Sequence, residues 1–118
     1  MKRLSGLDAA FLSMEVPSAP MHVASIIVLD PSTVEGGVGP AQLKALYESR
    51  IHLAPPFRRR LVEVPFGIHH PVWIEDPDFD LDFHLRHIAV PSPGTMDELS
   101  ELVGHLVAMP LDRRRPLW

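Results

Sequence analysis

Apolar residues recur at helical spacing in three stretches of the chain. The last is the clearest, because leucines and valines return every three or four positions after Thr95 and Glu98, a pair typical of a capping box. Ser5 and Asp8 form a similar pair before the first stretch, and Pro40 begins the second at a position that favours proline. The predicted helices cover about residues 6–13, 40–54 and 96–108.

Strand patterns occupy much of the remaining chain. Residues 22–29 are rich in valine and isoleucine on both side-chain faces, which predicts a buried strand. Residues 80–90 alternate apolar and charged side chains, which predicts a half-buried strand. Two shorter strands are expected over residues 60–64 and 71–75, and residues 111–118 resemble the beginning of another. Interleaved helices and strands predict an α+β fold class with mixed α/β character.

Composition narrows the class of protein. The 118 residues suffice for one small domain, and a content of 46% hydrophobic and 22% charged residues excludes a fully disordered chain. The absence of cysteine excludes disulfide scaffolds and thiolate metal sites. A net charge of −4 argues against general nucleic-acid binding. There is no apolar run of membrane-helix length and no signal-peptide pattern, so we expect a cytoplasmic location.

Two sets of side chains invite a metal-site hypothesis. His84 and His87 are three residues apart, and on the predicted strand such residues point to opposite faces. Four aspartates alternate between residues 76 and 82, but the glycine and the distal glutamate of a calcium loop are missing. We therefore expect no metal site, and we interpret the aspartates as a solvated loop leading into an edge strand.

The triplet Arg58-Arg59-Arg60 has two interpretations. Arginine forks bind phosphate groups well, including those of a CoA ester. The same triplet suits a solvated turn with one arginine in an internal ion pair, which we favour because no phosphate-binding glycine loop accompanies it. The chain also lacks a Gly-x-Ser-x-Gly elbow and a cysteine nucleophile, so its residues alone indicate only a soluble α+β domain.

Four motifs in order along nearly the whole chain change this picture, because together they resemble the wax ester synthase/diacylglycerol acyltransferase family. They are Leu4-Ser5-x-x-Asp8-x-x-Phe11-Leu12 with Pro20-Met21-His22-Val23, Phe57-Arg58-x-Arg60-Leu61, Trp73 to Gly94 with Phe79-Asp80-Leu81-Asp82-Phe83-His84, and Leu111 to Trp118 with Pro116-Leu117-Trp118. The resemblance implies a fold related to chloramphenicol acetyltransferase and to condensation domains, with two lobes and a tunnel between them.

The resemblance also implies an activity. Acyl-CoA would be the donor co-substrate, no further cofactor would be needed, and diacylglycerol or a long-chain alcohol would be the acceptor. The products would be triacylglycerol or wax ester, and contact with a membrane or lipid-inclusion surface would follow from their chemistry. Pro116, Leu117 and Trp118 match a motif usually assigned to structure, the helix beginning at Ser5 would pack near the tunnel, and Arg58 or Arg60 would contact CoA phosphate.

The catalytic motif of the family, His-His-x-x-x-Asp-Gly, is not found in this sequence. His69 and His70 are followed by Pro71-Val72-Trp73 and lie upstream of Trp118, whereas the family places its catalytic pair downstream of that motif. We therefore assign no catalytic residue within residues 1–118. The resemblance predicts an incomplete amino-terminal lobe that is inactive alone, with apolar surface exposed for self-association.

Two alternatives remain at this point. The chain could be a non-enzymatic lobe that binds acyl chains or pairs with a separately encoded carboxy-terminal half. It could also be part of a condensation domain that acts on carrier-protein thioesters, although such domains usually open differently from Pro20-Met21-His22-Val23.

Overall fold

The computed structural model describes residues 1–118, and its helices begin at the predicted caps. Helix α1 (Gly6–Met14) follows Ser5, whose hydroxyl accepts a hydrogen bond from the Asp8 backbone N–H at 3.1 Å. Helix α4 (Met96–Ala108) has a complete capping box, in which Glu98 accepts the Thr95 backbone N–H at 2.7 Å. Both helix predictions are confirmed, because short-range hydrogen bonds satisfy the first free N–H groups.

The second predicted helix is also confirmed. Helix α2 (Pro40–Arg50) begins with proline at its first turn and continues into the 3₁₀ turn Ile51–Leu53. The helical geometry is interrupted at Ala54, because Pro55 has no N–H to donate and disfavours helical geometry in the residue before it, and a further 3₁₀ turn then spans Pro55–Arg58.

One antiparallel sheet contains both short strands that the sequence predicts. Strand β2 (Arg59–Val62) pairs with β3 (Val72–Glu75), in a register that places Leu61 opposite Trp73. The other edge of β3 pairs with the two-residue strand β1 (Lys2–Arg3), giving the order β1-β3-β2. Strand β1 was not predicted, since two charged residues carry no periodic signal.

The prediction of a buried strand over residues 22–29 is wrong. This segment has no strand pairing, and its apolar side chains face solvent, with Val23 96% and Ile27 77% exposed. An extended segment becomes a strand only when a neighbour accepts and donates its backbone hydrogen bonds. No segment of this chain forms such backbone hydrogen bonds with residues 22–29.

The prediction of a strand over residues 80–90 is also wrong. Its first half is the short helix α3 (Leu81–His84), and the residues after it have no regular structure. The Asp80 carboxylate accepts the Asp82 backbone N–H at 3.0 Å, and this local cap stabilises a helical turn where alternation indicated a strand. His84 therefore lies on a helix, so the strand argument against pairing it with His87 does not apply. The chain nevertheless contains no group of three or more metal-ligating side chains.

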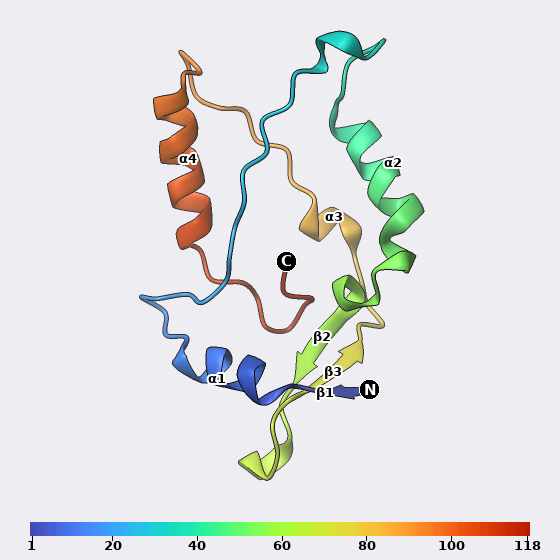
Figure 1. Cartoon of the computed structure of the whole chain (residues 1–118), viewed down its shortest axis with the longest axis vertical. Coiled ribbons are helices and arrows are strands. Elements are labelled where there is room, and N and C mark those ends of the chain that lie inside the picture. The colour runs from blue at the N-terminus through green and yellow to red at the C-terminus, as the bar shows by residue number, and fades with distance from the viewer.

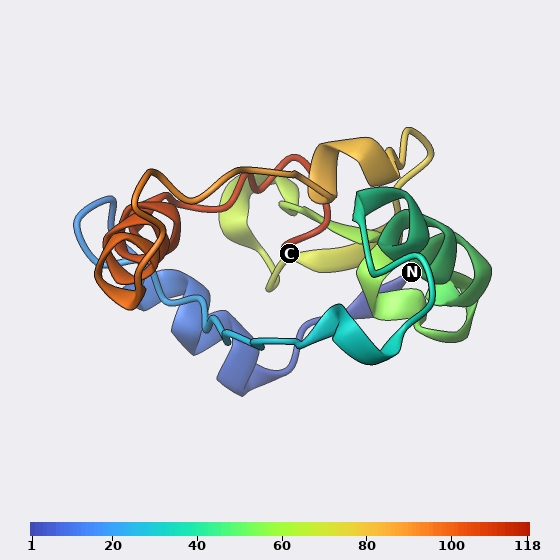
Figure 2. The same cartoon turned by 90° about the horizontal axis from the view of Figure 1, so that it is seen from above.

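The elements lie around the edge of an open arrangement. In Figure 1, α2 and α4 stand on opposite sides, and the sheet lies at one end with α1. Viewed from above in Figure 2, α2 and α4 again lie on opposite sides. The radius of gyration is 17.2 Å, whereas a compact chain of this length has about 13.5 Å. None of the helices combines the length and the apolar composition that a membrane span requires.

Little of the chain is buried. Only four of the 118 residues are buried, and they are Leu4, Leu61, Asp76 and Pro116. Leu4 and Leu61 are the hydrophobic ones, and both belong to or adjoin the small sheet. The conformation of the chain therefore depends on local caps, on the sheet and on a few long-range polar contacts.

Replacing Thr95 with alanine is expected to weaken α4, because the capping hydroxyl is lost. Such a loss costs about 1 kcal/mol of helix stability, and circular dichroism should show reduced helical signal and a lower melting temperature. Ser100→Ala is the matched control, since the Ser100 hydroxyl only donates to the Met96 carbonyl within the same helix. Equal losses in both variants would contradict the capping role.

Candidate functional site

Trp118 connects segments that are far apart in the sequence. Its indole N–H donates to the Phe57 carbonyl oxygen at 2.7 Å. Its ring stacks on His84, with centroids 4.4 Å apart and planes 8° apart, and on Tyr47 at 5.9 Å. Phe57 packs edge-on against it at 5.3 Å. The last residue of the Pro116-Leu117-Trp118 motif thus joins α2, α3 and the turn before β2.

His84 is the closest partner of Trp118. Its Nδ1 lies 2.7 Å from the Trp118 carbonyl oxygen, which can only accept, so Nδ1 carries the hydrogen. Its ring also stacks near Phe79, with centroids 5.6 Å apart. Nε2 is buried without a hydrogen-bond partner. This histidine, which the sequence suggested as a metal candidate and as part of a family motif, positions an aromatic cluster.

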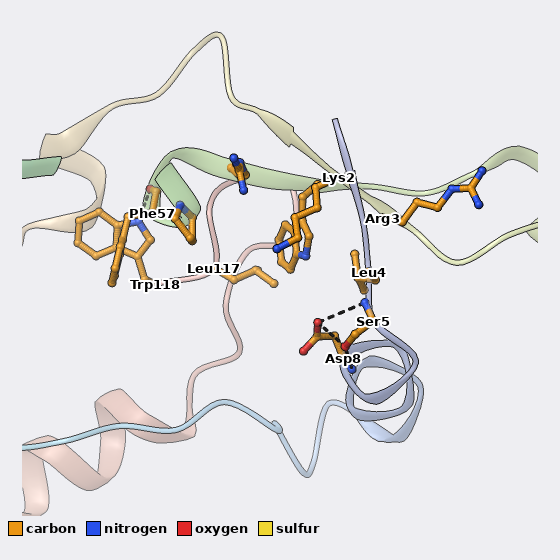
Figure 3. A pocket seen from close by; sticks show the side chains of 11 residues that line it. Lys2, Arg3, Leu4, Ser5, Asp8, Phe57, Leu117 and Trp118 are labelled. Atoms are coloured by element: carbon orange, nitrogen blue, oxygen red, sulfur yellow. Dashed lines mark hydrogen bonds between the residues drawn. The ribbon is translucent and has the colours of Figure 1, made fainter. Parts of the chain in front are cut away.

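A cavity of about 500 Å³ lies beside this cluster. Phe57, Trp73 and Trp118 supply aromatic walls, and Lys2 and Arg59 supply positive charge. Figure 3 shows Lys2 extending toward Leu117, while Arg3 extends away from it. Neither Lys2 nor Arg59 belongs to an ion pair. The cavity therefore combines aromatic surface with uncommitted cations.

The same cavity has one anionic side chain, Asp8. One oxygen of its carboxylate is already engaged, because Oδ2 accepts from the Ser5 hydroxyl at 2.7 Å and from the Ser5 backbone N–H at 3.4 Å. Figure 3 marks these contacts at the start of α1. The capping box thus places a carboxylate with one engaged oxygen at the cavity wall.

A second, apolar cavity of about 700 Å³ lies on the other side of the Leu117-Trp118 segment. Its lining comes from α1, from the end of α4 and from the extended segment after Pro20. Eleven of its fourteen lining residues are hydrophobic, and the others are Glu15, His22 and Ser25. Leu117 and Trp118 line both cavities and so form a shared wall.

Glu15 fixes the edge of the apolar cavity. Its carboxylate accepts the Met21 backbone N–H at 3.1 Å and lies 3.0 Å from Arg113 Nη2. The same Nη2 also donates to the Leu12 carbonyl oxygen at 3.0 Å. The Met21 hydrogen bond, followed by that from Arg113, lowers the pKa of Glu15. These contacts hold the end of α1, residue 21 and the segment before the carboxy-terminal motif together.

Arg58 and Arg60, the two arginines predicted to contact CoA, are paired with carboxylates. Arg58 Nη2 lies 3.4 Å from Glu75, and Arg60 Nε lies 3.4 Å from Asp76. This arrangement matches the ion-pair interpretation, while contact of either arginine with CoA stays a prediction. Arg59 is the member of the triplet that lines the aromatic cavity.

The acidic stretch differs in one respect from the solvated loop that we expected. Asp76 is 5% exposed and accepts the Asp78 backbone N–H at 3.2 Å, in addition to its contact with Arg60. Its own N–H donates to the Arg58 carbonyl oxygen at 2.8 Å. A buried carboxylate needs such partners, and Asp76 therefore closes the end of the β2–β3 pair.

Each arginine of a second triplet, Arg113-Arg114-Arg115, also has a partner. Arg113 pairs with Glu15, Arg114 pairs with Asp112 at 3.0 Å, and the Arg115 guanidinium lies 4.1 Å from the centre of the Phe83 ring. The Arg114 hydrogen bonds lower the pKa of Asp112 to about 2. Each partner except Asp112 is distant in sequence, so no local pattern could have revealed these contacts.

The adjacent histidines lie away from both cavities. His69 and His70 are exposed, and they belong to the connection between β2 and β3. Neither lines the aromatic or the apolar cavity. Their position gives no reason to assign them a catalytic role.

Comparison with known proteins gives these features a context. Residues 4–118 match the family model for the wax ester synthase/diacylglycerol acyltransferase catalytic domain. The chain belongs to this family. A putative diacylglycerol O-acyltransferase of Mycobacterium tuberculosis is 48% identical over the whole chain, which spans 25% of that relative. A probable diacylglycerol O-acyltransferase of the same organism is 40% identical over 98% of this chain and 42% of its own length.

A solved structure of a wax ester synthase/diacylglycerol acyltransferase is also similar to this chain. The enzyme of that name from Marinobacter aquaeolei VT8 matches 98% of this chain with a TM-score of 0.70 and 30% identity. The match covers 28% of the Marinobacter chain. The expected fold class is confirmed, and the chain spans between about a quarter and two fifths of the length of these three proteins.

Acid is expected to release Arg113 from Glu15. Because the folded-state pKa of Glu15 is below its ordinary value of 4.5, the contact stabilises the fold above that value and is lost as the pH falls through the lowered pKa. Carboxyl ¹³C NMR should place the Glu15 midpoint below the ordinary value and move it upward in Arg113→Gln. Arg114→Gln is the control, and an equal shift there would refute the pairing.

Substituting Trp118 with phenylalanine should separate the hydrogen bond from the stack. The Phe57 carbonyl loses its donor, which costs about 1 kcal/mol, while an aromatic ring remains beside His84. Trp118→Ala also removes the stack and should cost more than Trp118→Phe, since the half-buried ring loses its contacts with His84 and Tyr47. Urea unfolding measures both, with Trp73→Phe as control because the Trp73 indole N–H makes no hydrogen bond. Equal stability of Trp118→Phe and wild type would contradict the role of the indole donor.

Proposed function

We propose that this chain is the amino-terminal part of an O-acyltransferase that moves a long-chain acyl group from acyl-CoA to diacylglycerol or a long-chain alcohol. The observation that carries the proposal is the match of residues 4–118 to the catalytic-domain family, together with the backbone similarity to the Marinobacter enzyme. The products would be triacylglycerol or wax ester. Because acceptor and product are lipids, we place the reaction at a membrane or lipid-inclusion surface reached by peripheral contact.

The two cavities suit the two ends of an acyl-CoA donor. The apolar cavity between α1 and α4 offers hydrocarbon surface for an acyl chain. The aromatic cavity offers Lys2 and Arg59 for phosphate oxygens and Trp73 for stacking. Leu117 and Trp118 line both, so one molecule could pass along this shared wall.

The acid–base chemistry would come from the rest of the family fold. A general base near neutral pKa removes the acceptor hydroxyl proton, the oxygen attacks the thioester carbonyl, and the CoA thiolate leaves. The chain has no His-His-x-x-x-Asp-Gly motif to supply that base. Acyl-CoA is a co-substrate in this scheme, no further cofactor takes part, and residues 1–118 alone are inactive.

A non-enzymatic acyl-binding lobe is the second candidate. The observation in its favour is that the apolar cavity is built entirely from residues of this chain. Saturable binding of an acyl ligand by the 118-residue chain, without any gain of transferase activity after the remaining fold is added, would support this candidate over the enzyme.

A chimera tests the enzyme. Residues 1–118 of this chain replace the matching segment of the 48% identical M. tuberculosis relative, and ester formation from acyl-CoA and diacylglycerol is measured. Activity is expected in the chimera and not in the 118-residue chain. A folded chimera without transfer would refute the proposed function, provided that the unmodified relative is active in the same assay.

Arg59 is expected to contribute to donor binding in that chimera. Removing its charge in Arg59→Gln should raise the KM for acyl-CoA roughly tenfold and leave kcat nearly unchanged, because the lost contact is equal in ground and transition states. Arg114→Gln is the matched control, since Arg114 is paired with Asp112 and lies outside both cavities. An unchanged KM in Arg59→Gln would exclude this assignment.

A further inference from the structure

A small polar niche lies between the end of α2 and the sheet. It has a volume of about 140 Å³, and none of the five residues that line it is hydrophobic. They are His52, Pro55, Arg58, Arg59 and Glu75. In Figure 1, the end of α2 meets the start of β2 and the end of β3 at this place. Since one water molecule takes about 30 Å³ of the liquid, the niche has room for a phosphate group.

The local sequence brings these side chains together. The 3₁₀ turn Ile51–Leu53 continues α2 and carries His52. A second 3₁₀ turn follows and ends at Arg58. Arg59 then begins β2 and is the register partner of Glu75, the last residue of β3. The niche is therefore built by two short turns and one strand pair.

Positive charge exceeds negative charge in the niche. Arg58 and Arg59 are permanently charged, His52 has a ring N–H even when neutral, and Glu75 is the one carboxylate. Glu75 lies 3.4 Å from Arg58 Nη2, while Arg58 Nε has no hydrogen-bond partner. Arg59 belongs to no ion pair. Guanidinium donors with surplus charge are the groups that recognise a phosphate dianion best.

The niche adjoins the aromatic cavity, because Arg59 lines both. In that cavity Phe57 and Trp73 offer aromatic faces, and Lys2 offers a further cation. The two spaces together suit a ligand with an aromatic base and with phosphates at two separate places. Acyl-CoA has this chemistry, since its adenosine carries a diphosphate at the 5′ position and a single phosphate at the 3′ position.

We propose that His52, Arg58 and Arg59 bind the 3′-phosphate of the donor nucleotide, so that the niche selects acyl-CoA over donors without this phosphate. The inference rests on the proposed function and names a specificity site within it. Glu75 opposes the anion by its charge while it pairs with Arg58. Inorganic phosphate and phospholipid headgroups share the phosphate chemistry, but they lack the adenine that would stack in the adjacent aromatic cavity.

Two nucleotides that differ in one phosphate test the niche without catalysis. The chimera described above is titrated by calorimetry with adenosine 3′,5′-bisphosphate and with adenosine 5′-monophosphate. The bisphosphate should bind roughly tenfold more tightly, because charge-assisted hydrogen bonds to the added phosphate contribute about that much. Equal affinities would overturn the proposal. Inorganic phosphate that binds as tightly as the bisphosphate would also overturn it, in favour of a general anion site.

Two substitutions should change this preference in opposite directions. His52→Ala should reduce the preference for the bisphosphate to roughly threefold or less, and His105→Ala, an exposed histidine on α4, is its control. Glu75→Gln should tighten bisphosphate binding by roughly threefold, because a like charge is removed. Glu63→Gln, an exposed carboxylate just after β2, controls for net charge. A gain of affinity cannot result from misfolding. An unchanged preference in both His52→Ala and Glu75→Gln would refute the site.

Donor kinetics distinguish this inference from the proposed function. The KM of the chimera for acyl-CoA should be roughly tenfold lower than for the 3′-dephospho analogue, with nearly equal kcat, because the contact is the same in ground and transition states. Ester formation with equal KM values would refute the 3′-phosphate site and leave the proposed function intact. Preferential binding of the bisphosphate by a folded chimera that forms no ester would refute the proposed transfer and leave the nucleotide site intact.

Discussion

The chain has almost no hydrophobic core. Its tertiary arrangement therefore depends on a few contacts of its last residue, Trp118. Trp118 binds the Phe57 carbonyl, stacks between His84 and Tyr47, and accepts from His84 through its own carbonyl oxygen. These contacts bring α2, α3 and the sheet to one place, although they lie tens of residues apart in the sequence. The two cavities exist because this residue and Leu117 form the wall between them.

A second set of contacts does the same for the other half of the molecule. The Glu15 carboxylate accepts a hydrogen bond from the Met21 backbone N–H and pairs with Arg113. It therefore connects the end of α1 to the beginning of the extended segment and to the chain before Pro116. Polar pairs carry this task because apolar burial is nearly absent. Since a partly exposed ion pair contributes modestly by itself, the geometry relies on several such contacts acting together.

The sequence revealed the parts of the fold that are determined within a few residues. The caps at Ser5 and Thr95 and the proline at position 40 placed three helices correctly, because each satisfies or removes a free backbone N–H nearby. The wrong strand predictions, over residues 22–29 and 80–90, required a neighbouring strand that the local pattern cannot supply. The site, too, could be predicted only where local sequence determines it. The Pro116-Leu117-Trp118 motif was visible, but the cations that line the cavity, Lys2 and Arg59, are defined only by the sheet register and by which arginines are already paired.

The exposed apolar segment over residues 22–29 has a consequence for aggregation. Its backbone groups make no hydrogen bond, so they are available to any other strand. Polar and turn-forming residues stand at its two ends, His22 on one side and Asp30-Pro31 on the other, and the Asp30 carboxylate caps the turn by accepting the Ser32 N–H at 2.9 Å. Such flanks limit the length that an aberrant sheet can reach, so they reduce the tendency of this segment to aggregate.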